Sequence, residues 1–176
     1  METVDVIVIG GGVIGASIAF HLSSRGMKDV LIVERNSLAS AASSQAAGLI
    51  MQVTGKPSIT PLVQRTIGAF SDLQAILDEN IPFRQVGCVR VGASCQTIAD
   101  NQKNALAASK ADISYETWDQ NKLKQNVPWL ETKATEGGIF FPGDGYIDPY
   151  LLATAYARAA KLNGVKIKQG TSVVDI

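Results

Sequence analysis

The sequence has few of the residues that carry metal, disulfide or acid–base chemistry. Its 176 residues include two cysteines and one histidine, too few for a disulfide framework or a zinc cluster. An excess of either charge is also lacking, because sixteen Lys and Arg balance sixteen Asp and Glu. Without a basic footprint, nucleic acid is not an expected partner. We expect no metal site.

The cysteines and the N-terminal segment both favour the cytoplasm. Cys88 and Cys95 do not form a CxxC pair, and we interpret them as unpaired core thiols of a reducing compartment. Residues 4–20 lack the basic n-region of a signal peptide, and glycines interrupt their apolar run. This run is too polar to span a bilayer, so we expect no membrane span.

Apolar residues are abundant. They make up 46% of the chain, which is enough for a globular core. Residues 4–9 and 30–33 are short Val- and Ile-rich runs typical of buried parallel strands. Residues 13–25 between them have helical spacing of apolar residues. Strand, helix and strand in about thirty residues predict a βαβ unit.

A glycine motif joins the first strand to this helix. Gly10, Gly12 and Gly15 spell G-x-G-x-x-G, and Glu34 follows at the end of the second strand, 19 positions after Gly15. In a dinucleotide-binding site these glycines allow a tight turn, approach of a pyrophosphate and close helix packing, and the acidic residue binds ribose hydroxyls. The charge of Glu34 disfavours NADP, but the motif alone leaves FAD and NAD both open.

The regular pattern stops after Glu34. Residues 36–48 are rich in Ser and Ala, and a helix from Thr60, as N-cap, to about residue 80 follows. Residues 83–91, 115–118 and 138–141 favour strands around a helix at 94–109. Asp148 then caps a helix, and residues 165–167 and 173–174 favour strands. We predict an α/β fold, with a nucleotide domain at 1–80 and 148–176 and an inserted, incomplete α+β module at 81–147.

Three further side chains are weak candidates for chemistry. His21 has no carboxylate three or four positions away, so we interpret it as an ordinary helix residue. Arg90 and Tyr146 could face a substrate carboxylate, but an exposed strand Arg and a packed Tyr are the favoured interpretations. Catalytic residues therefore stay unknown.

Several motifs in order resemble one family. They are Gly10 to Gly15, Glu34-Arg35, Ser43-Ser44-Gln45-Ala46-Ala47-Gly48-Leu49, Gly145-Tyr146-Ile147-Asp148-Pro149, Gly164 to Ile167 and Thr171 to Val173. The order resembles the FAD-dependent D-amino-acid oxidase superfamily, in particular its glycine oxidase and sarcosine oxidase branch. The resemblance implies a Rossmann-like FAD-binding domain, an α+β substrate-binding module and oxidation of a small amine or amino acid such as glycine, sarcosine or proline.

The resemblance also implies which residues hold FAD. The implied set comprises Gly10, Gly12, Val13, Ile14, Gly15, Glu34 and Arg35 on the ADP side, Ala42, Ser43, Ser44, Ala47, Gly48 and Leu49 on the pyrophosphate and flavin side, and Val173 at the adenine. In dimethylglycine and sarcosine dehydrogenases a similar run carries a His that bonds covalently to the flavin. Gln45 stands in the matching position here and has no nucleophilic ring nitrogen, so we expect non-covalent FAD.

Members of this family are about twice as long, so the resemblance covers their N-terminal half. We therefore expect a fragment, a truncated product or one piece of a split enzyme, inactive alone, with a homo-oligomer or a partner chain supplying what is missing. The electron acceptor stays unknown. The alternatives are an NAD-dependent dehydrogenase and a non-catalytic nucleotide-binding subunit.

Overall fold

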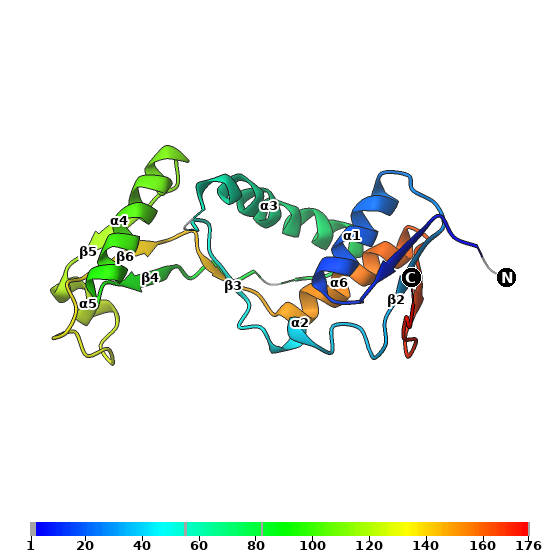
Figure 1. The fold of residues 1–176 in the computed structure, drawn as a ribbon. Coiled ribbons are helices and arrows are strands. Elements are labelled where there is room, and N and C mark those ends of the chain that lie inside the picture. Colours follow the sequence, from blue (N-terminus) through cyan, green and yellow to red (C-terminus); the bar gives the residue numbers. More distant parts are fainter. Residues whose placement is uncertain (1–2, 55, 82, 176) are drawn as a thin grey trace. The chain divides into compact units, whose positions relative to one another are not determined.

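A computed structural model describes residues 3–54, 56–81 and 83–175 (Figure 1). The chain forms two compact units. The first comprises Met1–Gly48, Ala69–Pro82 and Ile147–Ile176, and the second comprises Leu49–Gly68 and Phe83–Tyr146. Helix α3 (Thr60–Leu77) belongs to both, because the unit boundary falls between Gly68 and Ala69.

The first unit is built on a parallel sheet in the order β1-β2-β8, formed by β1 (Val6–Ile9), β2 (Val30–Val33) and β8 (Lys166–Lys168). Helix α1 (Val13–Ser24) connects β1 to β2 and packs along helix α6 (Pro149–Leu162). Alanines allow the close approach of these helices, since Ala16, Ala19, Ala155 and Ala159 are fully buried. The predicted βαβ unit is confirmed.

Local sequence signals set the ends of both helices. Asp148 caps α6, and its Oδ1 accepts hydrogen bonds from the backbone N–H of Tyr150 at 2.9 Å and of Leu151 at 3.0 Å. Gly26 after α1 and Gly164 after α6 have positive φ, the left-handed conformation that favours glycine at a helix end. Both helices therefore lie close to where the sequence places them.

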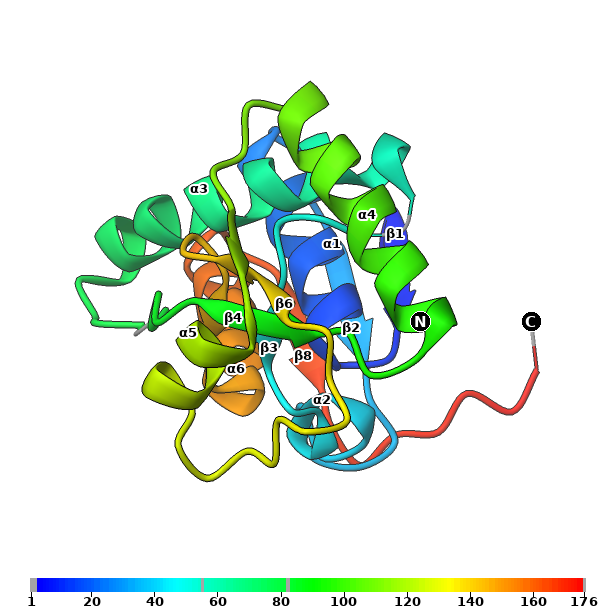
Figure 2. The same cartoon turned by 90° about the vertical axis from the view of Figure 1, so that its left-hand side faces the viewer.

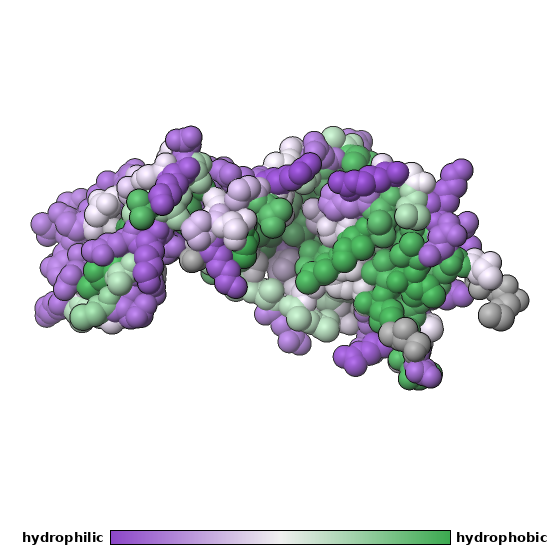
Figure 3. Space-filling model, turned by 45° about the horizontal axis from the view of Figure 1, so that its top comes forward, coloured by the Kyte–Doolittle hydropathy of each residue, from purple (hydrophilic) through white to green (hydrophobic). Residues whose placement is uncertain are grey.

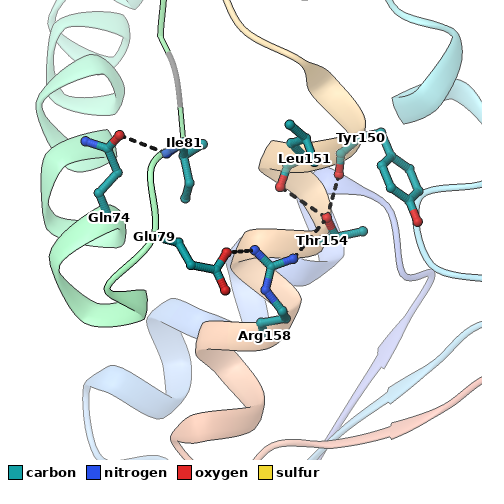
Figure 4. A network of polar contacts seen from close by, with 7 residues as sticks. All are labelled: Gln74, Glu79, Ile81, Tyr150, Leu151, Thr154 and Arg158. Atoms are coloured by element: carbon teal, nitrogen blue, oxygen red, sulfur yellow. Dashed lines mark hydrogen bonds and ion pairs between the residues drawn. The ribbon is translucent and has the colours of Figure 1, made fainter.

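Polar contacts fix the end of α3 and bind the loop after it to α6 (Figure 4). Glu79 forms an ion pair with Arg158 of α6. Gln74 Oε1 accepts a hydrogen bond from the backbone N–H of Ile81 at 2.9 Å, which fixes the turn at the end of α3. These contacts all lie within the first unit.

The second unit has an antiparallel sheet in the order β4-β6-β5, formed by β4 (Cys88–Val91), β6 (Gly138–Phe141) and β5 (Glu116–Trp118). Figure 2 shows β4 beside β6. Helix α4 (Cys95–Lys110) packs on this sheet, and Ser94 and Thr97 form a capping box at its start. A small core of Val53, Ala107, Ala108, Ile113, Ile139 and Phe141 lies within the unit. The remaining elements are α2 (Ala42–Gln45), β3 (Leu49–Ile50), a 3₁₀ turn (Pro57–Ile59), α5 (Gln120–Asn126) and β7 (Gly145–Tyr146).

Some sequence expectations differ from the structure. Residues 173–174 form no strand, because the chain leaves the sheet after Lys168. Thr60 has helical φ and ψ and follows a 3₁₀ turn, so it is not an N-cap. Helix α5 was not predicted. Residues 49–68 belong to the second unit, whereas the sequence pattern groups them with residues 1–48. That the first unit binds the cofactor and the second unit the substrate stays a prediction.

The first unit leaves apolar side chains of β1 in contact with water. Ile7 and Ile9, on one face of β1, are each 55% exposed, and Figure 3 shows hydrophobic residues gathered on this unit. Among the described residues no strand pairs with β1 on the side away from β2. Within the same residues, none of the helices has the length and apolar character needed to cross a membrane.

Candidate cofactor-binding site

A cleft of about 510 Å³ lies where β1 and β2 end. Its volume falls in the range of small-molecule and cofactor pockets. The loops after β1 and β2 meet there with the segment that follows β8, which is where open parallel sheets bind ligands. The lining comprises Ile9, Gly10, Gly12, Val33, Glu34, Arg35, Ala39, Ser40, Ala41, Ala42, Ser43, Thr171, Ser172 and Val173.

Steric limits explain the glycines of the turn. Gly10 has φ of +104°, and a Cβ on Gly15 would lie 2.0 Å from the Gly10 carbonyl oxygen. Gly11, which the motif leaves unspecified, is less restricted, because a Cβ there would lie 2.5 Å from Leu38 Cδ2, the end of a flexible side chain. No pattern in the sequence selects Gly11, since Leu38 meets it only in the folded loop.

The N-terminus of α1 faces this cleft through Gly12, its N-cap residue, which has no side chain to cap the helix. Ser43, 30 positions away in the sequence, supplies the cap instead, because its Oγ accepts a hydrogen bond from the Val13 N–H at 3.0 Å. The first turn of α1 contains no acidic residue. The partial positive charge of the helix end is therefore available to a phosphate group.

Glu34 is held at the end of β2 by backbone donors. Its Oε2 accepts from the Gly11 N–H at 2.7 Å and its Oε1 accepts from the Asn36 N–H at 2.8 Å. Both bonds lower the pKa of the Glu34 carboxyl, and the bond from the Asn36 N–H has the larger effect. An ionised carboxylate has about four lone-pair positions, so two remain for ribose hydroxyls.

The rim of the cleft is formed by two segments far apart in the sequence. The Thr171 N–H donates to the Glu34 carbonyl oxygen at 2.9 Å, which brings residues 171–173 beside β2. Ala39 is buried with φ of +58°, and its N–H donates to the Gly11 carbonyl oxygen at 3.0 Å. The loop after β2 is thus bonded directly to the glycine turn.

The structure brings together part of the predicted set. The predicted residues that line the cleft are Gly10, Gly12, Glu34, Arg35, Ala42, Ser43 and Val173. The others lie outside its lining: Val13, Ile14 and Gly15 in α1, Ser44 in α2, Ala47 and Gly48 after α2, and Leu49 in β3 of the second unit. Their role in binding stays a prediction.

Sequence reasoning missed the other lining residues, which are Ile9, Val33, Ala39, Ser40, Ala41, Thr171 and Ser172. Ile9 and Val33 are the last residues of β1 and β2, so the rule that ligands bind at the carboxyl ends of parallel strands could have selected them. Thr171 belongs to a motif of the family resemblance, but that rule does not select it, because the pairing of β8 with β2 brings it to the cleft.

The three weaker candidates, His21, Arg90 and Tyr146, are not among the residues that line the cleft. The His21 ring lies 5.0 Å from the Phe20 ring, between centroids, on α1. Arg90 is not an exposed strand residue, because only 16% of its side chain is accessible and it pairs with Asp144. Tyr146 is 43% exposed and so is not a packed residue. Both favoured interpretations were wrong, and for Arg90 the reason is its ion pair with Asp144, a residue 54 positions away.

The described residues fit FAD in the cleft. The turn at Gly10 and Gly12 presents backbone without side chains, the α1 N-terminus suits a pyrophosphate, and Glu34 suits a ribose. Among these same described residues, no three His, Cys, Asp or Glu side chains come together as metal ligands.

Comparison with known proteins gives concordant results. The family of FAD dependent oxidoreductases named DAO matches residues 5–176. The chain is 29% identical over 170 residues to 4-methylaminobutanoate oxidase (formaldehyde-forming) of Paenarthrobacter nicotinovorans, covering 97% of this chain and 21% of that protein. It is 28% identical to glycine oxidase of Geobacillus kaustophilus, covering 98% and 47%.

Solved structures extend this likeness to the fold. The crystal structure of glycine oxidase from Bacillus cereus has a TM-score of 0.82 at 29% identity, and the match covers 99% of this chain and 48% of that one. L-proline dehydrogenase from P. horikoshii, at 24% identity, has the same fold with a TM-score of 0.87. The chain spans about a fifth of the length of 4-methylaminobutanoate oxidase and about half that of glycine oxidase.

Proposed function

Since the chain belongs to the family of FAD-dependent oxidoreductases, we propose that it is the FAD-binding part of an enzyme that oxidises the C–N bond of a small amine or amino acid. The observation that carries the proposal is the cleft in which the glycine turn, the α1 N-terminus and Glu34 meet. Glycine oxidase and 4-methylaminobutanoate oxidase among the relatives support this substrate class.

The residues of the first unit have distinct tasks in this proposal. Gly10 and Gly12 let the pyrophosphate approach the backbone, and the α1 N-terminus stabilises its charge. Glu34 accepts hydrogen bonds from the adenosine ribose, and Val173 contacts the adenine. The chemistry that FAD supplies when bound is acceptance of a hydride from the carbon next to the nitrogen. The chain's contribution is therefore binding and orientation.

The second unit contributes to the substrate side in this proposal. Its polypeptide is continuous with the first unit at residues 48–49 and 146–147 and along α3. Because the relatives are about two to five times longer than the matched region, we propose that further polypeptide, in the same chain or in a partner, completes the substrate site. The chain alone is then expected not to turn over glycine, sarcosine or proline with a dye acceptor.

Glu34→Ala tests the proposed site. The wild-type chain should bind ADP and FAD, and purified holoprotein should absorb near 450 nm, roughly where flavins absorb and nicotinamides do not. The variant should lose about 1.5–3 kcal/mol of ADP affinity, since it removes hydrogen bonds to a charged group. Isothermal titration measures both proteins. Equal ADP affinity would remove Glu34 from the site, and a wild type that binds neither ligand would contradict the function.

The same holoprotein tests how the flavin is attached. We propose non-covalent attachment, because the family resemblance puts Gln45 at the position of the linking His, and a carboxamide has no nucleophilic ring nitrogen. Acid precipitation should leave the yellow flavin in the supernatant. A mass increase of one FAD on the denatured chain would contradict this.

A further inference from the structure

One side chain bonds the two segments that form the rim of the cleft. Oε1 of Gln169, the residue directly after β8, accepts a hydrogen bond from the Leu38 N–H at 2.8 Å, although 131 positions separate the two residues. Both residues belong to the first unit. In the described part of the chain, neither is among the residues that line the cleft. Gln169 therefore acts on a ligand only through the residues that it holds in place.

Main-chain bonds beside Gln169 join the same two segments. The Thr171 N–H donates to the Glu34 carbonyl oxygen at 2.9 Å, and the Gly170 N–H donates to the Asn36 carbonyl oxygen at 3.2 Å. Gly170 has φ of +65°, a conformation that glycine adopts without strain. The chain after β8 thus runs beside the loop after β2, and the Gln169 side chain extends this contact further along the loop.

Leu38 packs in turn against the glycine turn. Its side chain is half-buried, and its Cδ2 lies 2.5 Å from where a Cβ on Gly11 would be. The next residue, Ala39, donates its N–H to the Gly11 carbonyl oxygen at 3.0 Å. Leu38 and Ala39 thus enclose Gly11 with one side chain and one backbone bond. The position of Leu38 therefore influences where the Gly11 peptide lies.

The Gly11 peptide matters because it orients Glu34. The Gly11 N–H donates to Glu34 Oε2 at 2.7 Å, and the Asn36 N–H donates to Glu34 Oε1 at 2.8 Å. Asn36 is itself bonded through its carbonyl oxygen to Gly170. Both donors to the carboxylate are thus held, directly or through Leu38, by the two residues that follow β8.

The bond between Gln169 and Leu38 contributes more to local order than to overall stability. Gln169 is exposed, so water competes for its amide, and its long side chain loses rotamer freedom when it is fixed. Residues 34–41, which the structure describes throughout, form neither helix nor strand, so their order depends on bonds of this kind. A ligand that must order a loose loop loses affinity. Fixing this loop in advance therefore favours binding.

We propose that Gln169 is a positioning residue, which acts through Leu38 and Gly11 to hold the Glu34 carboxylate where it accepts hydrogen bonds from the ribose of a bound dinucleotide. This inference rests on the proposed function, because that function assigns the ribose to Glu34. Gln169 lies between two motifs of the family resemblance and belongs to neither. All the contacts involved lie within the first unit.

The test measures the dissociation constant of ADP in the 176-residue chain. Gln169→Met keeps an unbranched side chain of similar length but removes the amide oxygen, so ADP should bind at least about fivefold more weakly. Gln74→Met is the matched control. Gln74 Oε1 also accepts a backbone N–H within the first unit, from Ile81 at 2.9 Å, and neither residue is among those that line the cleft. The control should bind ADP within about twofold of wild type.

A double-mutant cycle tests whether Gln169 acts through Glu34. In the Glu34→Ala background, Gln169→Met should change the dissociation constant of ADP by less than about twofold, because the group that Gln169 positions is gone. Two residues that bind the nucleotide independently would instead give additive losses.

Two measurements without ligand follow the same contacts. In Gln169→Met the Leu38 amide should exchange with deuterium at least about tenfold faster than in wild type, and Gln169→Glu, which keeps an acceptor oxygen, should restore exchange to within about threefold. The pKa of the Glu34 carboxyl should rise in Gln169→Met, because the bonds from Asn36 and Gly11 lower this pKa in wild type. NMR titration of the carboxyl carbon measures it, and the control variant should leave it unchanged.

Four outcomes would overturn the inference. One is an unchanged ADP affinity in Gln169→Met, and another is an equal loss in Gln74→Met, which would assign Gln169 to general stability. The others are an additive loss in the Glu34→Ala background and an unchanged Glu34 pKa, because Gln169 would then not act through this carboxylate. Each of the four would leave the proposed function standing. A wild type that binds neither ADP nor FAD would instead refute the proposed function, and this inference with it.

Discussion

The two units differ in the distance over which their structure is specified. In the first, a glycine turn, a following helix and a strand are neighbours in sequence, and the cleft forms around them. In the second, the central ion pair joins Arg90 to Asp144, 54 positions apart. Local geometry thus builds the glycine turn of the first unit, whereas the rim of its cleft and the ion pair of the second unit depend on residues far apart in the sequence.

The two units also differ in which apolar side chains they expose to water. The second unit buries a charge at Asp144 and presents Leu49 and Met51 to water. The first unit buries all of β2 but leaves Ile7 and Ile9 of β1 half exposed. Parallel sheets are normally covered on both faces, so the first unit is the one whose core is incomplete within the described residues.

The largest expected effect tests the local specification of the first unit. Gly15→Ala should destabilise the chain by about 3 kcal/mol or more, because overpacking against backbone cannot relax easily. Gly68→Ala is the control, since a Cβ at this helical position would meet no atom within 4 Å, and the better helix former should be neutral or stabilising. Denaturant unfolding measures both. A Gly15→Ala chain as stable as wild type would show that α1 can shift away from β1.

The next effect concerns the exposed strand. The chain should self-associate at micromolar concentration, and Ile7→Lys should weaken this association at least about tenfold, because a charge on an edge strand opposes pairing. Leu162→Lys is the control, as Leu162 is 68% exposed at the end of α6. Sedimentation velocity compares the variants. Equal association of wild type and Ile7→Lys would place the contact elsewhere.

The smallest effect is the pH dependence that comes from Glu34. Its pKa is lower in the folded chain than the ordinary value of 4.5, so its stabilisation is fully present above that pH and is lost as pH falls through the folded pKa. The stability difference between wild type and Glu34→Gln should be under about 1 kcal/mol, because solvent screens a partly exposed group. Thermal unfolding between pH 3 and pH 7 measures it. A difference that grows on acidification would contradict this sign.

The sequence predicted those parts that depend on near neighbours. Strand β6 begins and ends where the pattern places it, and Asp148 caps α6 as expected. Prediction failed where distant residues decide the outcome. Val173 is of a residue type common in strands but follows the end of the sheet, and Arg90 is largely shielded from water and pairs with Asp144 of a distant turn.

The cleft was predictable in part for the same reason. Gly10, Gly12 and Glu34 follow from spacing alone. Gly11 and Thr171 do not, because their surroundings are formed by Leu38 and by the pairing of β8 with β2. An alternating or helical pattern contains no information about which loops meet at the end of a sheet.

The left-handed alanine at the rim of the cleft affects how readily a ligand can bind. A non-glycine residue with positive φ raises the energy of the folded chain by about 1–2 kcal/mol, and burial and the bond to the Gly11 carbonyl hold Ala39 in place. Glycine would remove this strain but would give the unfolded loop more freedom. With alanine the rim has few alternative shapes, so a nucleotide that enters loses little affinity to ordering it.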